Sequence, residues 1–400
     1  MAVRLFAHEV SDLCIGKPAL RSLSVSDTVG DALSALKKLG EIYLSVWSCD
    51  HSSNPAAIKS EINVKGFAEE DCRCVGKVCM VDVICYLCKE ENLASPAVAL
   101  QSPISVLIPK ASGLVRHLEP HASLLEAIDL ILEGASHLVV PIEARSTRNS
   151  RIKLLEQKPS FDSTLHNNRE YCWLTQEDII RYLINSIGLF SPTPINPINS
   201  LNVVDTNRFL ALHYDDPAYS ALSLISEALI HQTSVAIVDL DGKLIGEISP
   251  FTLNSCDEAA SAAIATLSAG DLMAYIDCGG PPEELVQLVK ERLEERNLGA
   301  AMELMEEESV LSTWSSFCST SSEEEFSSTK NGKLGGYSAR LVRRSEAIVC
   351  YPWSSLVAVM IQALAHRVSY VWVVEEDGTL TGVVTFTGML NVFREQLKSM

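Results

Sequence analysis

A second strand that ends at a small residue and leads into a helix occurs four times in this chain. The four copies read GKVCMVDV, CWLTQEDI, GEISPFTL and GVVTFTGM. Each follows an Ala- and Leu-rich segment with helical spacing and a short hydrophobic strand. Because self-similarity of this kind is typical of repeat architectures, it constrains the fold more than any other feature. It predicts four copies of one unit of helix, strand, strand and helix.

The third and fourth copies show the unit most clearly. In both, an Asp-Gly turn joins the two strands, at Asp241-Gly242 and at Asp377-Gly378. The helix of the fourth copy is expected in SSLVAVMIQALAHR, where Ser354 or Ser355 suits the N-cap. In the first and second copies, polar insertions at roughly 50–71 and 145–169 separate the two strands.

Composition excludes several classes of protein. A hydrophobic fraction of 47% supports packed cores, and 400 residues allow two to four domains. The formal net charge of -19 argues against nucleic acid and anionic membranes as partners. No segment is apolar and long enough for a transmembrane span, and the N-terminus does not resemble a secretory signal. With 12 cysteines and no such signal, we expect reduced thiols and a cytoplasmic location.

The four corner sequences resemble the CBS (cystathionine-β-synthase) motif family, whose pattern ends in Gly-x-φ-[Ser/Thr]-x-x-Asp-φ, where φ is apolar. Four copies in two tandem pairs resemble the plant proteins of the CBSX type, which consist of CBS domains only. The layout is also similar to that of the γ subunits of AMP-activated kinases. The resemblance implies an α+β fold of four CBS (β-α-β-β-α) repeats, arranged as two tandem CBS pairs (Bateman modules).

On this resemblance the chain divides into six segments. They are motif 1 at 8–92 with its insertion at about 50–71, motif 2 at 110–189 with its insertion at about 145–169, a Pro-rich linker at 190–200, motif 3 at 201–276, a charged helix with a Ser- and Glu-rich stretch of disordered composition at 277–336, and motif 4 at 337–400. We expect the charged helix to start after Pro281-Pro282.

The family commonly binds AMP, ATP or S-adenosylmethionine as a regulatory ligand, with no cofactor required and no catalysis. In that family the motif Asp accepts hydrogen bonds from the ribose, and the Ser/Thr serves the phosphate. A carboxylate and a helix N-terminus are chemically suited to these roles. The resemblance therefore implies a non-catalytic regulatory protein that senses an adenosine-containing ligand.

The motif acids are kept only in the N-terminal pair. Motif 2 keeps both Thr175 and Asp178, and motif 1 keeps Asp82 but has Cys79 at the Ser/Thr position. We therefore expect ligand contacts from these four residues. Motifs 3 and 4 keep the weaker corner positions Ser249 and Thr385, but their motif acids are replaced. The alternative for Asp82 and Asp178 is a purely structural role as helix caps.

Two further functions remain open. The chain could be a ligand-independent scaffold, similar to a kinase γ subunit, that modulates an unidentified partner such as a kinase or a redox enzyme; a homodimer is also compatible with the resemblance. Alternatively, it could be a metal- or redox-responsive switch whose candidate metal ligands flank the first insertion, namely Cys49, His51, Cys72 and Cys74. Cys85 and Cys88 have C-x-x-C spacing, but we expect them to pack in a helix core.

Overall fold

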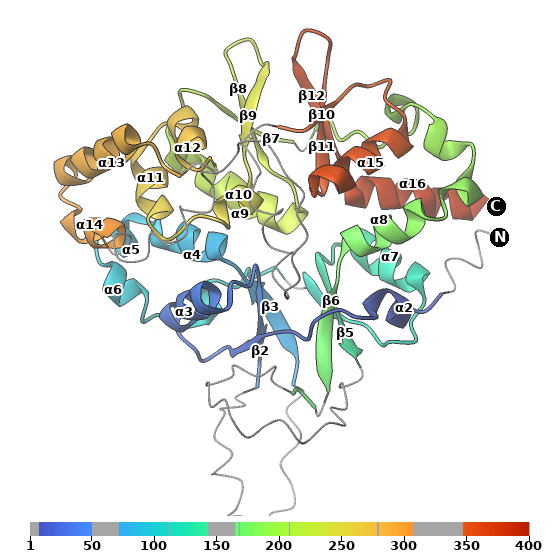
Figure 1. The fold of residues 1–400 in the computed structure, drawn as a ribbon, viewed down its shortest axis with the longest axis horizontal. Coiled ribbons are helices and arrows are strands. Elements are labelled where there is room, and N and C mark those ends of the chain that lie inside the picture. Colours follow the sequence, from blue (N-terminus) through green and yellow to red (C-terminus); the bar gives the residue numbers. More distant parts are fainter. Residues whose placement is uncertain are drawn as a thin grey trace, which may run out of the picture. The chain divides into compact units, whose positions relative to one another are not determined.

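The computed structural model describes residues 8–49, 72–111, 113–142, 165–167, 169–207, 209–277, 280–306 and 347–399. Within this part of the chain lie four small sheets of three strands each (Figure 1), which confirms the mixed α and β class. In every sheet the first two strands are parallel and the last two are antiparallel. Most of the two insertions and of the Ser- and Glu-rich stretch lies outside the described residues.

Each repeat contributes one sheet and two helices in the order β-α-β-β-α. Motif 1 consists of β1 (Ser22–Ser24), α3 (Val29–Leu39), β2 (Leu44–Trp47), β3 (Cys74–Val78) and α4 (Met80–Leu87). Motif 2 consists of β4 (Val115–His117), α7 (Leu124–Leu132), β5 (His137–Ile142), β6 (Glu170–Leu174) and α8 (Gln176–Ile184). Motif 3 consists of β7 (Leu210–His213), α9 (Ala221–His231), β8 (Val235–Val238), β9 (Leu244–Ile248) and α10 (Pro250–Leu253). Motif 4 consists of β10 (Val349–Cys350), α15 (Leu356–His366), β11 (Tyr370–Val374), β12 (Leu380–Thr385) and α16 (Phe386–Ser399).

The remaining elements connect the repeats. They are the α-helices α2 (Val10–Cys14), α5 (Glu90–Leu93), α6 (Pro96–Ala99), α11 (Ala260–Thr266), α12 (Ala269–Tyr275), α13 (Glu283–Glu295) and α14 (Gly299–Glu306), and the 3-10 turns η2 (Ile104–Val106), η3 (Ile187–Phe190), η4 (Thr193–Ile195), η5 (Ile198–Ser200) and η6 (Ala218–Ser220). The sequence predicted one charged helix after Pro281-Pro282. The structure has two, α13 and α14, because Asn297 between them takes a positive φ of 57° that a helix does not allow.

Local sequence explains where the helices begin. Thr28 forms a capping box at the start of α3: its hydroxyl accepts from the amide of Asp31, and the Asp31 carboxylate accepts from the Thr28 amide at 3.0 Å. Ser355, one of the two predicted caps of α15, accepts from the amide of Ala358. Both Asp-Gly turns are confirmed, since Gly242 and Gly378 have φ values of 79° and 87° that favour glycine.

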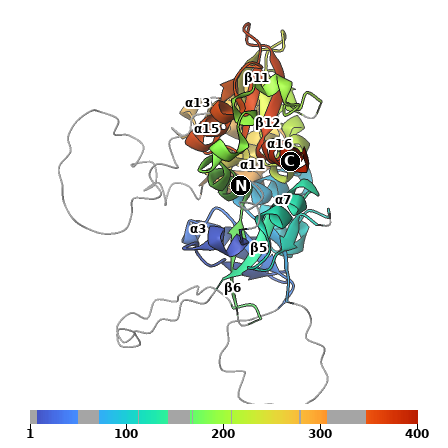
Figure 2. The same cartoon turned by 90° about the vertical axis from the view of Figure 1, so that its right-hand side faces the viewer.

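The chain forms two compact units whose boundaries do not follow the order of the repeats. Unit 1 contains the sheets of motifs 1 and 2 together with α16, the last helix of motif 4. There, Arg394 of α16 donates from Nε to Asp129 Oδ1 of α7 at 2.6 Å, and Figure 2 shows α16 beside α7. Unit 2 contains the sheets of motifs 3 and 4 together with α4 of motif 1. Within it, the Met80 amide of α4 donates to Asn254 Oδ1 at 2.9 Å.

A buried carboxylate joins the two sheets of unit 2. Glu247 of β9 is 2% exposed and accepts from the Tyr370 hydroxyl at 2.8 Å and from the Trp372 indole at 2.7 Å, both on β11. A buried charge is tolerated when such donors replace its water. The sheets also meet at their hairpin tips, where the Leu244 amide donates to the Gly378 carbonyl.

The helices of the described residues include none that combines the length and the apolar character required to cross a membrane.

Candidate functional site

The corner of motif 2 is a capping box at the start of α8. The Asp178 carboxylate accepts, at Oδ2, from the Thr175 amide at 2.7 Å and from the Thr175 hydroxyl at 2.6 Å. The Thr175 hydroxyl in turn accepts from the Asp178 amide at 3.3 Å. The N-cap of α8 is Thr175, and Asp178 supplies the carboxylate of the capping box from the third helical position. Its structural role is therefore seen, and the contact with a ribose remains a prediction.

A lysine distant in sequence completes this corner. Lys17, which follows α2, places Nζ 2.5 Å from Asp178 Oδ2 and 2.9 Å from the Trp173 carbonyl oxygen. The Lys17 and Asp178 side chains are 21% and 24% exposed, so the pair lies half-buried rather than in the core. The sequence analysis did not identify Lys17. Its only sequence signal is a cation next to a proline after a short helix, which does not indicate a partner.

The hydrogen bonds to the Asp178 carboxylate use one of its two oxygens. Every hydrogen bond that the described residues make to the Asp178 carboxylate goes to Oδ2. Oδ1 is thus available to a hydroxyl donor, while the Lys17 ammonium and the amides that begin the nine-residue helix α8 supply positive potential. Its chemistry suits a group that combines hydroxyls with a negative charge, and ligand contact at Asp178 remains a prediction.

Two buried thiols lie next to this corner. Cys172 occupies the position where the motif pattern has glycine, and it is 1% exposed. Interaction with the Cys172 thiol lowers the pKa of Cys14, at the end of α2, below its ordinary value, and the nearby Lys17 charge acts in the same direction. The same contact raises the pKa of Cys172. The two thiols therefore belong to elements that pack together, α2 and the strand that leads into α8.

The corner of motif 1 has different surroundings. Asp82 Oδ2 accepts from the Cys79 amide at 2.8 Å, so Asp82 also completes a capping box, at the start of α4. Cys79 is only 1% exposed, which places its thiol in the protein interior. Because α4 belongs to unit 2 and α8 to unit 1, the two retained acids are parts of different units.

The corners of motifs 3 and 4 lack the acid and differ in exposure. Ser249 is 1% exposed, and its hydroxyl accepts from the Phe251 amide at 3.2 Å, while Thr252 is 3% exposed. Thr385 is the last residue of β12 and is half-buried. Ligand contact at these positions remains a prediction, and the motif 2 corner offers the more accessible groups.

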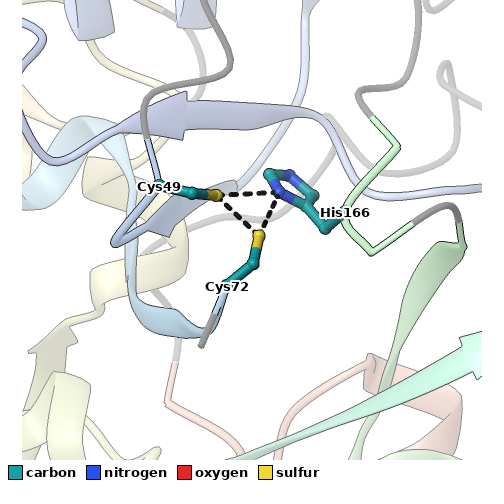
Figure 3. A group of neighbouring side chains, drawn as sticks. All are labelled: Cys49, Cys72 and His166. Atoms are coloured by element: carbon teal, nitrogen blue, oxygen red, sulfur yellow. Dashed lines mark hydrogen bonds between the residues drawn. The ribbon is translucent and has the colours of Figure 1, made fainter. Parts of the chain in front are cut away.

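The structure brings together part of the cysteine set that flanks the first insertion. Sγ of Cys49 lies 2.7 Å from Sγ of Cys72, and His166 Nδ1 lies 3.3 and 3.2 Å from these two sulfurs (Figure 3). Cys74 is not part of this cluster, because its thiol donates to the Gly76 carbonyl at 3.3 Å. His51 lies outside the described residues. The prediction of Cys74 as a ligand beside Cys49 and Cys72 therefore needs correction, and His166 takes that place.

His166 was missed because its partners lie far away in sequence. His166 lies shortly before β6, at the end of the second insertion. Cys72 has the equivalent place in motif 1, shortly before β3 at the end of the first insertion. A comparison of the same point in the two repeats could have found it.

The C-x-x-C pair packs in the protein interior. Cys85 and Cys88 are 8% and 1% exposed, and burial raises the pKa of both thiols, that of Cys88 to about 12. A thiol that stays protonated at neutral pH is a poor nucleophile. This burial agrees with the expected packing role.

Comparisons with known proteins agree with the four-repeat architecture. No protein-family model matches the chain. The chain is 47% identical over 409 residues to the CBS domain-containing protein CBSX5 of Arabidopsis thaliana, covering 100% of both chains. It is 21% identical over 401 residues to the SNF1-related protein kinase regulatory subunit gamma-like PV42b of the same plant, covering 99% of this chain and 97% of that one.

Among solved structures, a protein from Methanocaldococcus jannaschii, described as a candidate archaeal homologue of γ-AMPK, matches with a TM-score of 0.52. The match has 12% sequence identity and covers 96% of this chain and all of the archaeal one, so it supports the fold alone. CBSX5, by contrast, is 47% identical to this chain over the whole length of both proteins. The chain therefore belongs to the CBS domain-containing proteins of the CBSX type.

Proposed function

We propose that this chain is a non-catalytic regulatory protein of the cytoplasm that binds an adenosine-containing ligand (AMP, ATP or S-adenosylmethionine) at the head of α8 and thereby modulates a partner protein. The observation that carries the proposal is the Asp178 corner, where a half-buried carboxylate accepts its hydrogen bonds at one oxygen and lies beside a lysine and a helix N-terminus. Membership of the CBS domain family supports it.

Each part of such a ligand has a chemical counterpart at this corner. Asp178 Oδ1 would accept from a ribose hydroxyl. The Lys17 ammonium, 2.5 Å from Oδ2, would attract a phosphate or a carboxylate of the ligand, as would the first amides of α8. Because Lys17 follows α2 and Asp178 belongs to motif 2, a ligand that competes for Lys17 would act on the contact between α2 and α8.

Regulation requires that the ligand bind two arrangements of the protein with different affinities. The Lys17–Asp178 pair offers such a difference, since an anionic ligand that draws Lys17 away would weaken the attachment of α2. The resulting change would be communicated to the partner, for which a kinase or a redox enzyme is proposed.

Three separate calorimetric titrations of the full chain, with AMP, with ATP and with S-adenosylmethionine, test the proposal. We expect at least one of them to bind at concentrations that occur in cells and to bind more weakly to the Asp178→Ala variant. If none of the three binds, the sensing function is rejected.

A second function, the ligand-independent scaffold, is favoured by one specific observation. The Asp178 carboxylate is already neutralised by Lys17, so the acid of this corner is paired without any ligand. The relative PV42b is named as a gamma-like regulatory subunit of an SNF1-related kinase, which suggests the same kind of partner here. Reconstitution with an SNF1-related protein kinase, without nucleotide, tests the scaffold. Failure to form a complex would contradict it, and sedimentation of the chain alone would test for a homodimer.

A further inference from the structure

A thiol-imidazole cluster lies in unit 1, away from the corner sites. The ligand atoms of Cys49, Cys72 and His166 all lie within 4.8 Å of one another, and the three side chains point toward one another (Figure 3). Cys72 and His166 are 6% and 3% exposed, and Cys49 is half-buried. Two sulfurs and one imidazole nitrogen facing a common point from buried positions are a donor set typical of zinc.

The backbone positions these groups through the ladders of two sheets. The β2–β3 hairpin continues past Trp47, where the Ser48 amide donates to the Arg73 carbonyl at 2.9 Å, and this places Cys49 opposite Cys72. His166 is held by a two-hydrogen-bond bridge with Arg169, immediately before β6. The cluster thus joins the strand ends of motif 1 to those of motif 2.

Neighbouring side chains fix the orientation of the imidazole. The Trp47 indole stacks on the His166 ring with centroids 3.6 Å apart and planes at 4°. His166 Nε2 lies 2.9 Å from the Ser22 hydroxyl, which leaves Nδ1 directed at the two sulfurs. A histidine that binds a metal through one ring nitrogen characteristically donates a hydrogen bond from its other ring N–H, and a hydroxyl oxygen can accept it.

We propose that Cys49, Cys72 and His166 form a Zn²⁺ site. On binding, both thiols release their protons to solvent, and two Zn–S bonds and one Zn–N bond form without any change of oxidation state. The sulfurs, 2.7 Å apart without metal, would move to roughly 3.8 Å, the separation in a tetrahedral site with Zn–S bonds of about 2.3 Å. Among the described residues these three are the ligand set, and water or an exogenous ligand would complete a tetrahedral site.

The proposed site connects the strand ends that flank the two insertions. Cys49 precedes the first insertion, Cys72 follows it, and His166 lies at the end of the second. The corner residues Cys79 and Thr175 follow the opposite ends of β3 and β6. Zinc binding therefore does not depend on the proposed nucleotide function, and either can fail without the other.

Zinc analysis by mass spectrometry of the full chain, purified under reducing conditions without chelators, tests the site. We expect about one zinc per chain, as for a single three-ligand site, and loss of most of it in Cys72→Ser and in His166→Asn. The matched control is Cys74→Ser, since Cys74 is a neighbouring buried thiol outside the cluster, and this variant should keep its zinc. Ser22→Ala should weaken zinc affinity about 10- to 100-fold, because it removes the hydrogen-bond partner of Nε2 and leaves the three ligands in place.

A second measurement uses the unmodified chain and so does not depend on the folding of variants. After chelation, added Co²⁺ should produce the absorption of a tetrahedral thiolate site, and Zn²⁺ should abolish that absorption and raise the thermal midpoint. The site is rejected if the reduced chain neither carries zinc nor binds Co²⁺. Equal zinc loss in the Cys74→Ser control, or a Cys49–Cys72 disulfide in place of zinc in protein from its native cells, would also overturn it.

Discussion

Lys17 Nζ lies 2.5 Å from Asp178 Oδ2, although 161 positions of sequence separate the two residues. The contact attaches the segment after α2 to the first turn of α8, at the position where the family motif has its acid. Asp178 consequently has two structural duties, helix capping and ion pairing, besides the ligand contact proposed for it. Experiments on this residue must separate binding from stability.

Replacing Asp178 with alanine should weaken binding of the adenosine ligand by about 1.5–3 kcal/mol, because a charged hydrogen bond is removed. Calorimetric titration measures the affinity directly. The control is Asp31→Ala, which removes the same kind of capping box, with Thr28, from α3. It should reduce stability by about 1 kcal/mol and leave the affinity unchanged. Equal affinities in the Asp178 variant and the parent would place the ligand elsewhere.

Replacing Glu247 with alanine should destabilise unit 2 strongly. The buried Tyr370 hydroxyl and Trp372 indole would each lose an acceptor, at a cost of about 1–3 kcal/mol per donor. Tyr370→Phe removes one donor and leaves the other paired, so it should cost only about 1 kcal/mol. Urea unfolding followed by tryptophan fluorescence compares them. If the Glu247→Ala variant is as stable as the parent, the carboxylate contributes nothing to the stability of this core.

Stability should fall as the pH drops below the ordinary histidine range. Burial, with the nearby Lys77 charge, holds the pKa of His137 well below its usual value. The unfolded chain therefore binds more protons, so stability is complete above about pH 6.5 and declines as the pH falls toward the folded pKa. As the pH is lowered, the unfolding midpoint of the His137→Asn variant should decline less steeply than that of the parent. Part of the decline should remain, because burial also lowers the pKa of His117. Parallel curves for parent and variant would contradict this.

Two equivalent motif glycines should differ in their tolerance of alanine. A Cβ on Gly382 would lie 2.8 Å from the Asp205 carbonyl oxygen, which is backbone and cannot rotate away. A Cβ on Gly76 would have its nearest contacts with the Ile108 side chain, at 3.0 Å, and that side chain can move. We expect Gly382→Ala to cost about 1–3 kcal/mol and Gly76→Ala clearly less. Denaturant unfolding of the two variants decides this, and equal losses would refute the steric argument.

Several features of the fold were predictable because short-range interactions specify them. The Asp-Gly turns at Gly242 and Gly378 follow from residues that tolerate positive φ. The cap at Ser355 depends on an amide three residues away. The order of strands and helices follows from hydrophobic periodicity and from the repeated corner, which recurs at each of the four second strands.

The sequence by itself thus determined the repeat, its elements and the corner acids, including the position of Asp178. Only the tertiary structure decided that Lys17 neutralises Asp178, that His166 joins Cys49 and Cys72, and that α4 and α16 pack in units other than those of their own sheets. The physical reason is that backbone geometry and capping act over a few residues, whereas chain folding brings Lys17 to Asp178 across 161 positions and His166 to Cys72 across 94. The residues that surround Lys17 or His166 in the sequence do not indicate which distant residue each will contact.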